Sequence, residues 1–272
     1  EYQVKPPTPF VPGSEVAGTV RSAPEGSPLK EGDRVAGFPM LGGFAEVAVS
    51  PEFMTFPLPD SLDAAQGAAL ILNYHTAWFS MVIRGRLKAE ETVLVHGGAG
   101  GVGTASIQVA KGVGARAIAV VSSDEKEAVA REAGAAEVVR SDGDWRDEAR
   151  ELSGGGVDLV VDPVGGDRFT DSLRSLAEGG RLVVVGFTGG SIPEVKVNRL
   201  LLNNTEVIGA GWGAFVIGKP EINREIGGEI AKLIESGDVR PIVGARFPLA
   251  NAAEALKLID GRGATGKVVL EI

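Results

Sequence analysis

Three glycines with the spacing of a phosphate-binding loop follow a short apolar segment. Gly98, Gly100 and Gly103 fit the pattern Gly-x-Gly-x-x-Gly, directly after the run Thr92–His96 and before a helical stretch. In a strand-to-helix turn, the first glycine allows the tight turn, the second lets the backbone approach a pyrophosphate, and the third packs the helix against the strand. The helix N-terminus then offers N–H groups and its positive dipole end to phosphate oxygens. The pattern therefore predicts a dinucleotide site, with the pyrophosphate on Ala99, Gly100, Gly101 and Val102.

The sequence around this loop decides between nucleotide binding and a simple glycine turn. The chain has 39 glycines, about twice the average usage, so the pattern alone is weak evidence. Apolar runs of strand length, however, alternate with amphipathic helical stretches. This alternation predicts an α/β fold with a doubly wound Rossmann sheet of parallel strands. The expected strands are Thr92–His96, Ala117–Val121, Glu137–Arg140, Val157–Asp162, Arg181–Gly186 and Glu206–Gly209.

The two ends of the chain have a different character from the middle. The first 60 residues are rich in Pro and Gly, and three short runs predict a small antiparallel β unit: Val16–Val20, Arg34–Gly37 and Phe44–Val49. After Gly209, an amphipathic helix is followed by short β-like segments that we expect to rejoin this first unit. The sequence thus predicts a dinucleotide-binding domain over residues 76–210 and a second domain made of residues 1–75 and 211–272.

The residues at the end of the second strand of the sheet indicate whether the site binds NADH or NADPH. An acidic residue there would hold the ribose 2′-hydroxyl of NADH. Here Ser122 and Ser123 occupy the position and Lys126 follows, which suits the 2′-phosphate of NADPH. Asp124-Glu125 would favour NADH if it reached the ribose. Asp124 is alternatively a helix N-cap with Glu127 as its capping-box partner, and we prefer NADPH on that basis.

Two further loops are expected at the same edge of the sheet. Val164 and Gly165 follow the strand that ends at Asp162, and we expect them to contact the cofactor through their backbone. Gly186 and Phe187, after the next strand, are assigned to the site as well. His96 ends the first strand, where a buried histidine bonded to the backbone is favoured over a catalytic one.

Composition excludes several classes of protein. The net charge of −9 disfavours nucleic acids and anionic membrane surfaces as partners. No run approaches 18 apolar residues, and the first residues lack the pattern of a signal peptide, so we expect a cytoplasmic location. With no cysteine and only two histidines, His75 and His96, we expect no metal site.

Five segments in this order resemble the zinc-independent quinone oxidoreductase branch of the medium-chain dehydrogenase/reductase superfamily. They are Val95–Val109, Pro12–Gly18, Asn73–Trp78, Asp158–Gly166 and Gly180–Gly186. The resemblance covers essentially the whole chain and implies a Rossmann domain inserted in a GroES-like β domain. Ser14 stands where the zinc alcohol dehydrogenases carry a metal-binding histidine. Members of this branch usually have further residues before the segment matching Pro6–Gly18, so we expect an incomplete GroES-like domain here.

The resemblance also implies an activity and two more site residues. It implies an NADPH-dependent, zinc-independent oxidoreductase that transfers hydride to a quinone or an activated alkene such as an enone. Thr76 is expected to place a hydroxyl against the nicotinamide, in the cleft between the domains, or else to be an N-cap; Tyr74 either lines the cleft or belongs to the core. An enoyl-thioester or 2-alkenal reductase, and a non-catalytic NADPH-binding protein, are the alternatives. Pairing of Glu206–Gly209 with its twin in a second copy would give a homodimer.

Overall fold

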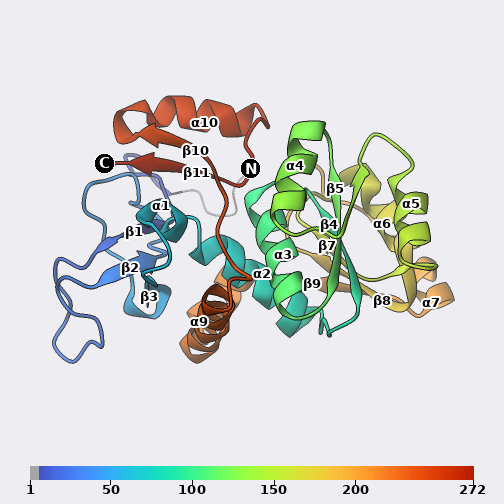
Figure 1. Ribbon diagram of the computed structural model, residues 1–272, viewed down its shortest axis with the longest axis horizontal. Helices are drawn as coiled ribbons and strands as arrows, with labels where there is room; N and C mark the ends of the chain where they lie inside the picture. Colours follow the sequence, from blue (N-terminus) through green and yellow to red (C-terminus); the bar gives the residue numbers. More distant parts are fainter. Residues whose placement is uncertain (1–5) are drawn as a thin grey trace. The chain divides into compact units, whose positions relative to one another are not determined.

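The computed structural model describes residues 6–272 and divides the chain into two compact units (Figure 1). Unit 1 contains the residues up to Leu72 together with Val243–Ile272, and unit 2 contains Asn73–Ile242. Within residues 6–272, none of the helices combines the length and the apolar character that crossing a bilayer requires.

Unit 2 is built on a six-stranded, all-parallel sheet. The strands are β4 (Thr92–His96), β5 (Arg116–Val121), β6 (Glu137–Arg140), β7 (Val157–Asp162), β8 (Leu176–Val184) and β9 (Glu206–Gly209). Their order across the sheet is β6-β5-β4-β7-β8-β9, and every neighbouring pair runs parallel. This is the Rossmann order 3-2-1-4-5-6, so the predicted fold class is confirmed.

Helices cover both faces of this sheet. Right-handed crossovers place α3 (Gly101–Gly112) and α4 (Asp124–Glu132) on one face. The chain then returns from edge strand β6 to central strand β7, which carries α5 (Trp145–Leu152) and α6 (Phe169–Ser175) to the other face. The pairs α3–α4 and α5–α6 are each in contact. The strands between them are therefore buried on both sides, which explains their almost continuous apolar sequences.

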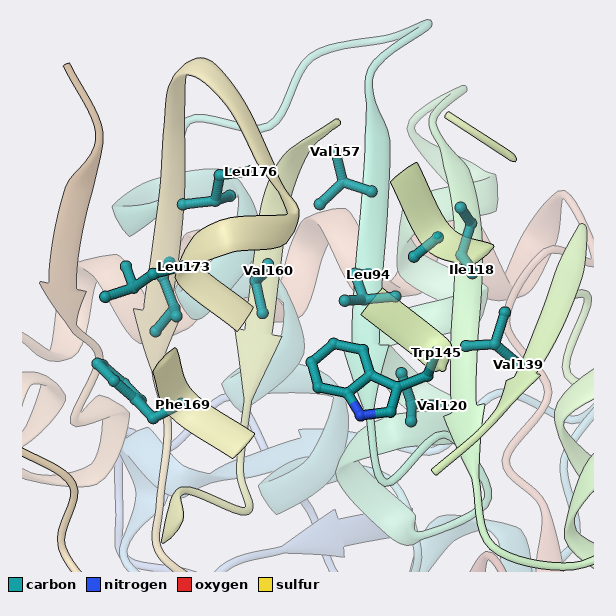
Figure 2. Close-up of a cluster of buried hydrophobic side chains, with 12 residues drawn as sticks. Leu94, Ile118, Val120, Val139, Trp145, Val157, Val160, Phe169, Leu173 and Leu176 are labelled. Carbon is teal, nitrogen blue, oxygen red and sulfur yellow. The ribbon is translucent and has the colours of Figure 1, made fainter. Parts of the chain in front are cut away.

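The face under α5 and α6 holds a cluster of buried hydrophobic side chains (Figure 2). Trp145 and Ala149 of α5 and Phe169 and Leu173 of α6 are buried against apolar strand residues. Each large apolar side chain buried in this way stabilises the fold by about 1.5–3 kcal/mol. The cluster's strand residues are Leu94, Ile118, Val120, Val139, Val157, Val160, Leu176 and Leu182.

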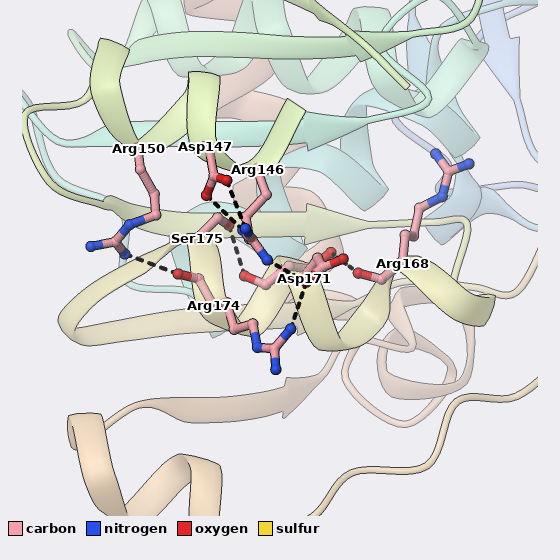
Figure 3. Close-up of polar contacts among 8 residues, drawn as sticks. Arg146, Asp147, Arg150, Arg168, Asp171, Arg174 and Ser175 are labelled. Atoms are coloured by element: carbon pink, nitrogen blue, oxygen red, sulfur yellow. Dashed lines mark hydrogen bonds and ion pairs between the residues drawn. The ribbon is translucent and has the colours of Figure 1, made fainter. Parts of the chain in front are cut away.

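A charged network joins α5 to α6 on the outside of this cluster (Figure 3). The guanidinium of Arg146 on α5 donates to Asp147 at 2.7 Å and to Asp171 on α6 at 3.1 Å. Arg174 also reaches Asp171, at 3.2 Å, and Arg150 donates to the Arg174 carbonyl oxygen at 2.9 Å. The two carboxylates raise the pKa of Arg146 above its ordinary value. These contacts align the two helices along their length.

The boundary at which the chain leaves unit 2 differs from the one predicted from the sequence. We predicted that residues 211–272 belong with the N-terminal β unit, but residues 211–242 pack in unit 2. Asn223, fully buried on α9 (Pro220–Glu235), bonds this helix to the rest of unit 2, since its side-chain oxygen lies 2.8 Å from Nδ1 of His75. It also accepts a hydrogen bond at 3.2 Å from Nε1 of Trp212, which begins α8 (Trp212–Ile217). Helix α7 (Asn198–Asn203) precedes β9.

The described residues of unit 1 form two small sheets. Strands β1 (Val16–Thr19), β2 (Arg34–Gly37) and β3 (Thr55–Pro57) form an antiparallel sheet, followed by α1 (Ala64–Gly67). Strands β10 (Val243–Pro248) and β11 (Lys267–Glu271) pair in parallel and are connected through α10 (Ala252–Asp260). The last residues thus rejoin the first unit, as expected. The predicted strand Phe44–Val49 is wrong: the segment is irregular, and Val49 is 91% exposed because no layer covers it.

Within unit 1, a buried carboxylate connects the first β-strand to the last one through an ion pair. The carboxylate of Glu15, beside β1, pairs with the ammonium group of Lys267 on β11. Its other oxygen accepts a hydrogen bond from the Leu72 N–H at 2.8 Å. The side chain of Glu15 is 4% exposed and that of Lys267 is 24% exposed, so the carboxylate is buried while the ammonium group keeps some contact with water.

Candidate functional site

The glycine-rich loop connects the end of β4 to the start of α3, where the sequence placed it. Gly97 has φ +62°, a left-handed conformation that glycine adopts freely, and so it makes the tight turn. We had assigned that turn to Gly98, and this assignment is wrong. Gly98 is required for another reason: a Cβ atom on it would lie 2.7 Å from the Cβ of Ala119 on β5. The absence of a side chain lets the loop lie directly on the neighbouring strand.

The two remaining glycines of the motif have opposite surroundings. A Cβ on Gly103 would lie 2.1 Å from the carbonyl oxygen of Gly97, so only glycine lets α3 pack this closely against the loop. A Cβ on Gly100 would meet a single atom, the same oxygen, at 3.4 Å. Gly100 has φ −82° and ψ 175°, which any residue adopts. The fold therefore needs Gly103, whereas the free space beside Gly100 is open to a ligand.

Helix α3 begins at this open space without a side-chain cap. Its N-cap is Gly100, and no side chain within the described part of the chain caps it. The first helical N–H to donate back to Gly100 is that of Thr104, at 2.8 Å. The N–H groups of Gly101, Val102 and Gly103 have no intrahelical acceptor because they belong to the first turn. With the helix dipole, they form a site for an anion.

Asn73 is a neighbour of this helix end to which the sequence analysis gave no role. A Cβ on Gly101 would lie 2.7 Å from its side-chain nitrogen, and Asn73 is 5% exposed. Asn73 thus explains why the position after Gly100 is also a glycine. The only sequence signal was its place two residues before His75 in the quoted segment Asn73–Trp78.

The loop after β7 is held in shape by Asp162. One oxygen of this buried carboxylate accepts hydrogen bonds from the N–H groups of Val164, at 2.9 Å, and Gly165, at 2.8 Å. Gly165 has φ +66°. Burial raises the pKa of Asp162 although both N–H groups act to lower it. Asp158 lies at the other end of the strand, bonded to the Thr92 N–H at 2.8 Å, so the two carboxylates do not form a catalytic pair.

The loop after β8 is bonded to the loop after β7. The N–H of Gly189 donates to the Val164 carbonyl oxygen at 2.8 Å, and the N–H of Thr188 donates to that of Pro163 at 3.1 Å. A Cβ on Gly165 would lie 2.9 Å from the Phe187 ring. Phe187 is 39% exposed, and Gly186 lies beside the Pro163 carbonyl oxygen. The structure therefore brings the predicted pairs Val164–Gly165 and Gly186–Phe187 together.

These loops meet the glycine-rich loop at the carboxyl edge of the sheet. A Cβ on Gly97 would lie 3.5 Å from a methyl group of Val164. On the other side, the N–H of Gly98 donates to the Val120 carbonyl oxygen at 3.1 Å, at the end of β5. The three segments thus occupy adjacent strand ends, where open α/β sheets bind their ligands.

The serines and the lysine after β5 occupy distinct positions. The Ser123 hydroxyl accepts a hydrogen bond from the Lys126 N–H at 3.3 Å and is the N-cap of α4. We had assigned that cap to Asp124, which is instead the first residue of the helix and pairs with Arg140. The exposed Ser122 hydroxyl lies 3.2 Å from Nζ of Lys126. Ser122 and Lys126 are therefore placed together as predicted.

Arg140 is a charged residue at this position that the sequence analysis did not single out. It ends β6 directly beside Val121 of β5, and it donates at 3.1 Å to the carbonyl oxygen of Ser122. A signal existed in the sequence, since parallel strands that are neighbours end at the same edge. The order of the strands was needed to use it.

Tyr74 and Thr76 lie on the helical run that leads into the sheet. This run consists of the π-helical turn Ile71–His75, α2 (Thr76–Trp78) and the π-helical turn Phe79–Arg84. Of the two roles expected for Tyr74, cleft residue or core residue, the structure supports the second, because the residue is 1% exposed and its hydroxyl donates to the Gln108 side chain at 2.8 Å. Burial raises its pKa far above the ordinary value. Tyr74 is a core residue.

Thr76 is 8% exposed and lies at the start of α2, which is in contact with α3. It is not an N-cap, because the preceding residue, His75, already has helical φ and ψ. The hydroxyl partner role for the nicotinamide stays a prediction.

Both histidines are buried and bonded within unit 2. Burial lowers the pKa of His75 to about 4, against the effect of its Asn223 partner. Burial lowers the pKa of His96 to about 3, and the positive charge of Arg168 adds to this effect. Nε2 of His96 lies 2.8 Å from the Ser172 hydroxyl, rather than bonding to the backbone as expected. Its ring packs edge-on against Trp145, with centroids 4.9 Å apart.

Comparison with known proteins agrees with this architecture. A model of the alcohol dehydrogenase GroES-like domain matches residues 1–60, and a model of zinc-binding dehydrogenases matches residues 101–226. Rat quinone oxidoreductase is 36% identical over 99% of this chain and 82% of its own length. A probable oxidoreductase from Mycobacterium abscessus has a similar structure, with TM-score 0.90 and 46% identity over 99% of this chain and 83% of its own. A quinone oxidoreductase from Escherichia coli, solved in complex with NADPH, has TM-score 0.87 and 29% identity over 99% and 85% of the two chains.

The parallel sheet, the glycine loop and these matches define a medium-chain dehydrogenase/reductase. Within that superfamily, the chain belongs to the quinone oxidoreductase family, and it is an oxidoreductase. The fold class and the resemblance inferred from the sequence are thereby confirmed.

Proposed function

We propose that this protein is an NADPH-dependent reductase of quinones or other activated, conjugated carbonyl compounds, and that it works without a metal. The observation that carries the proposal is the uncapped N-terminus of α3, with open space beside Gly100, at the carboxyl edge of a Rossmann sheet. The names of the relatives support the substrate class: rat and E. coli quinone oxidoreductases, the latter solved with NADPH.

Along this edge, separate groups of residues would bind the pyrophosphate, the 2′-phosphate and the nicotinamide half of NADPH. The N–H groups of Gly101 and Val102, with Ala99 and Gly100 beside them, would hold the pyrophosphate, and Gly98 and Gly103 would shape the loop. Ser122 and Lys126 would hold the 2′-phosphate, while Ser123 would keep the start of α4 in place through its cap. Val164, Gly165, Gly186 and Phe187 form the adjoining loops and would contact the nicotinamide half.

When bound, NADPH supplies the hydride, and the chain supplies placement and exclusion of water. Asp162 fixes the N–H groups of Val164 and Gly165 so that their loop keeps one shape. The Thr76 hydroxyl would orient the nicotinamide amide. A quinone or enone is already electrophilic, so its carbonyl oxygen needs a proton from solvent or a hydroxyl rather than a metal ion.

The acceptor class is tested by the oxidation of NADPH with a panel of acceptors. We expect turnover with 9,10-phenanthrenequinone and much slower turnover with a crotonyl thioester or a 2-alkenal. Preference for the thioester or alkenal would assign the protein to the enoyl reductases. Saturable NADPH binding without turnover of any acceptor would show a cofactor-binding protein and contradict the proposed activity.

We also propose that the protein forms a homodimer. Strand β9 is the last strand at one end of the sheet, and α7, which precedes it, exposes Leu201 and Leu202 by 77% and 74%. Pairing of two β9 strands across a two-fold axis would satisfy the open edge and cover these leucines. Sedimentation equilibrium should give twice the chain mass, and a Leu201→Asp/Leu202→Asp variant should sediment as a monomer. A wild-type monomer at micromolar concentration would contradict this proposal.

A further inference from the structure

We infer that Arg140 is a second phosphate-binding residue at the 2′-position and that Asp124 competes with the phosphate for it. This inference rests on the proposed function, since it concerns how NADPH is distinguished from NADH. The sequence analysis gave neither Arg140 nor Asp124 a part in binding the phosphate.

The position of Arg140 is fixed by the sheet rather than by a flexible loop. Arg140 is the last residue of β6 and pairs in register with Val121, the last residue of β5. The N–H of Ser141 donates to the Val121 carbonyl oxygen at 2.8 Å, which keeps the two strand ends together. From this point the guanidinium reaches the Ser122 carbonyl oxygen at 3.1 Å. Arg140 is thus attached to the residue whose hydroxyl lies 3.2 Å from Nζ of Lys126.

Two cations therefore flank Ser122 from different elements, Lys126 from α4 and Arg140 from β6. A phosphate placed at the Ser122 hydroxyl would be within reach of both. A planar guanidinium binds phosphate oxygens in pairs, and its bonds to a charged acceptor are stronger than neutral ones. The arrangement suits a doubly charged phosphate far better than a ribose hydroxyl.

In this structure the Arg140 guanidinium is paired with carboxylates. One terminal nitrogen of Arg140 pairs with Asp124, and its Nε lies 3.6 Å from the Asp142 carboxylate. Both acidic side chains are largely exposed, by 96% for Asp124 and 73% for Asp142, whereas that of Arg140 is 37% exposed. Exposed pairs of this kind are weak, so a phosphate can replace the Asp124 carboxylate without a large cost. The negative charge of Asp124 would also repel the phosphate.

Different effects are expected from the two kinds of residue. Arg140→Gln should weaken NADPH binding by about 10- to 100-fold, the range of a lost hydrogen bond to a charged group. Lys126→Ala should have an effect in the same range, and Arg140→Lys should retain part of the affinity. Asp124→Asn should strengthen NADPH binding by about 2- to 5-fold, the range of an exposed charge pair. Binding of NADH should change by less than about twofold in each variant.

Arg116→Gln is the matched control. Arg116 also bonds one carbonyl oxygen, that of Leu152 at 2.6 Å, and one carboxylate, that of Glu137 at 3.3 Å. It begins β5, however, and so lies at the amino edge of the same sheet. If general surface charge or loss of an arginine explained the effect, this variant would share it. We expect it to bind NADPH like the wild type.

Isothermal titration calorimetry with NADPH, NADH, 2′,5′-ADP and 5′-AMP tests the inference without any turnover. We expect the wild type to prefer NADPH over NADH and 2′,5′-ADP over 5′-AMP, and Arg140→Gln to lose most of both preferences. If the wild type binds NADPH preferentially and Arg140→Gln keeps the preference, Arg140 has no such role and the proposed function stands. If the wild type binds neither NADPH nor 2′,5′-ADP, the proposed function and this inference both fail.

Discussion

Two glycines of the phosphate loop have separate tasks, and substitutions can tell them apart. Gly100→Val should abolish NADPH binding, because its side chain would fill the space beside the N-terminus of α3, while the backbone angles of Gly100 suit valine. Gly103→Ala should destabilise the fold by about 1–3 kcal/mol, because its methyl group would overlap the Gly97 carbonyl oxygen. NADPH titration and urea unfolding of both variants measure these effects. Wild-type NADPH affinity in Gly100→Val would mean that the loop is only a turn.

The two buried histidines should make stability depend on pH. In the fold their pKa values are about 4 for His75 and about 3 for His96, below the ordinary value of 6.5. The unfolded chain therefore binds more protons as the pH falls through 6.5, and the free energy of unfolding decreases. Between pH 6 and 5 the decrease approaches about 1.4 kcal/mol per pH unit for each histidine. Urea unfolding in this range, above most carboxyl pKa values, measures the slope.

The matched variant for this prediction is His75→Gln, which removes one titrating group. Its slope should be about half that of the wild type, whatever its stability at pH 7. An unchanged slope would show that His75 does not remain neutral in the fold.

Side chains of the site differ in how far the sequence could place them. The glycines and Lys126 are recognisable because their spacing from the end of a strand has a direct physical meaning. Tyr74 was left open, since the same pattern serves a cleft residue and a core residue, and only its bond to Gln108 decides. The helix cap was misplaced by one residue because Ser123 and Asp124 are both good caps. Arg140 was missed because its neighbour Ser122 is 18 residues away in the chain.

The strands of unit 2 depend on one buried arginine at their amino edge. Arg181 on β8 donates to both carboxylate oxygens of Glu91, at 3.0 and 2.8 Å, and to the carbonyl oxygens of Gly85, Arg86 and Asp158. Burial acts to raise the pKa of Glu91, but the Arg181 guanidinium and the N–H and charge of Lys88 together outweigh burial, and the pKa lies below its ordinary value. The fold is therefore stabilised by this pair above the ordinary carboxyl pKa, and the contribution is lost as the pH falls.

Arg181→Ala should lower the free energy of unfolding by about 3–5 kcal/mol, because it leaves the Glu91 carboxylate and three carbonyl oxygens without their partner. The exposed pair Lys232–Glu229 on α9 provides the control, with side chains 68% and 42% exposed. Lys232→Ala should cost less than about 1 kcal/mol. Urea unfolding at pH 7 compares the two, and equal losses would contradict the structural role of Arg181.

Strands were easier to predict than the partners of helices. The buried parallel strands have apolar residues on both faces, so their positions can be recognised in the sequence. Five of the six expected strand ranges agree with the observed ones within a residue. The stripe of Ile222, Ile226 and Ile230 indicates that α9 is buried on one side, but such a stripe does not say against which unit. In the structure Asn223 bonds α9 to His75 and Trp212 of unit 2, and a sequence pattern does not contain such contacts.

The molecule gathers four distant segments at one edge of a sheet, and neither of its two histidines is available to bind a metal ion there. The chain has no cysteine, and His75 and His96 are bonded within the core. Among residues 6–272, no three acidic or histidine side chains are grouped to hold an ion. Quinone reduction should therefore survive exhaustive dialysis against EDTA. Elemental analysis that finds about one zinc per chain, together with activity lost on chelation, would overturn metal independence.

A single-turnover experiment tests the central claim most directly. The protein is first mixed with an equimolar amount of NADPH in the presence of EDTA. The mixture is then combined rapidly with 9,10-phenanthrenequinone, and the nicotinamide absorbance is followed. We predict that one equivalent of NADPH is oxidised in a phase much faster than in a protein-free mixture, and that Gly100→Val abolishes this phase. Bound NADPH that is oxidised no faster than free NADPH would contradict the account.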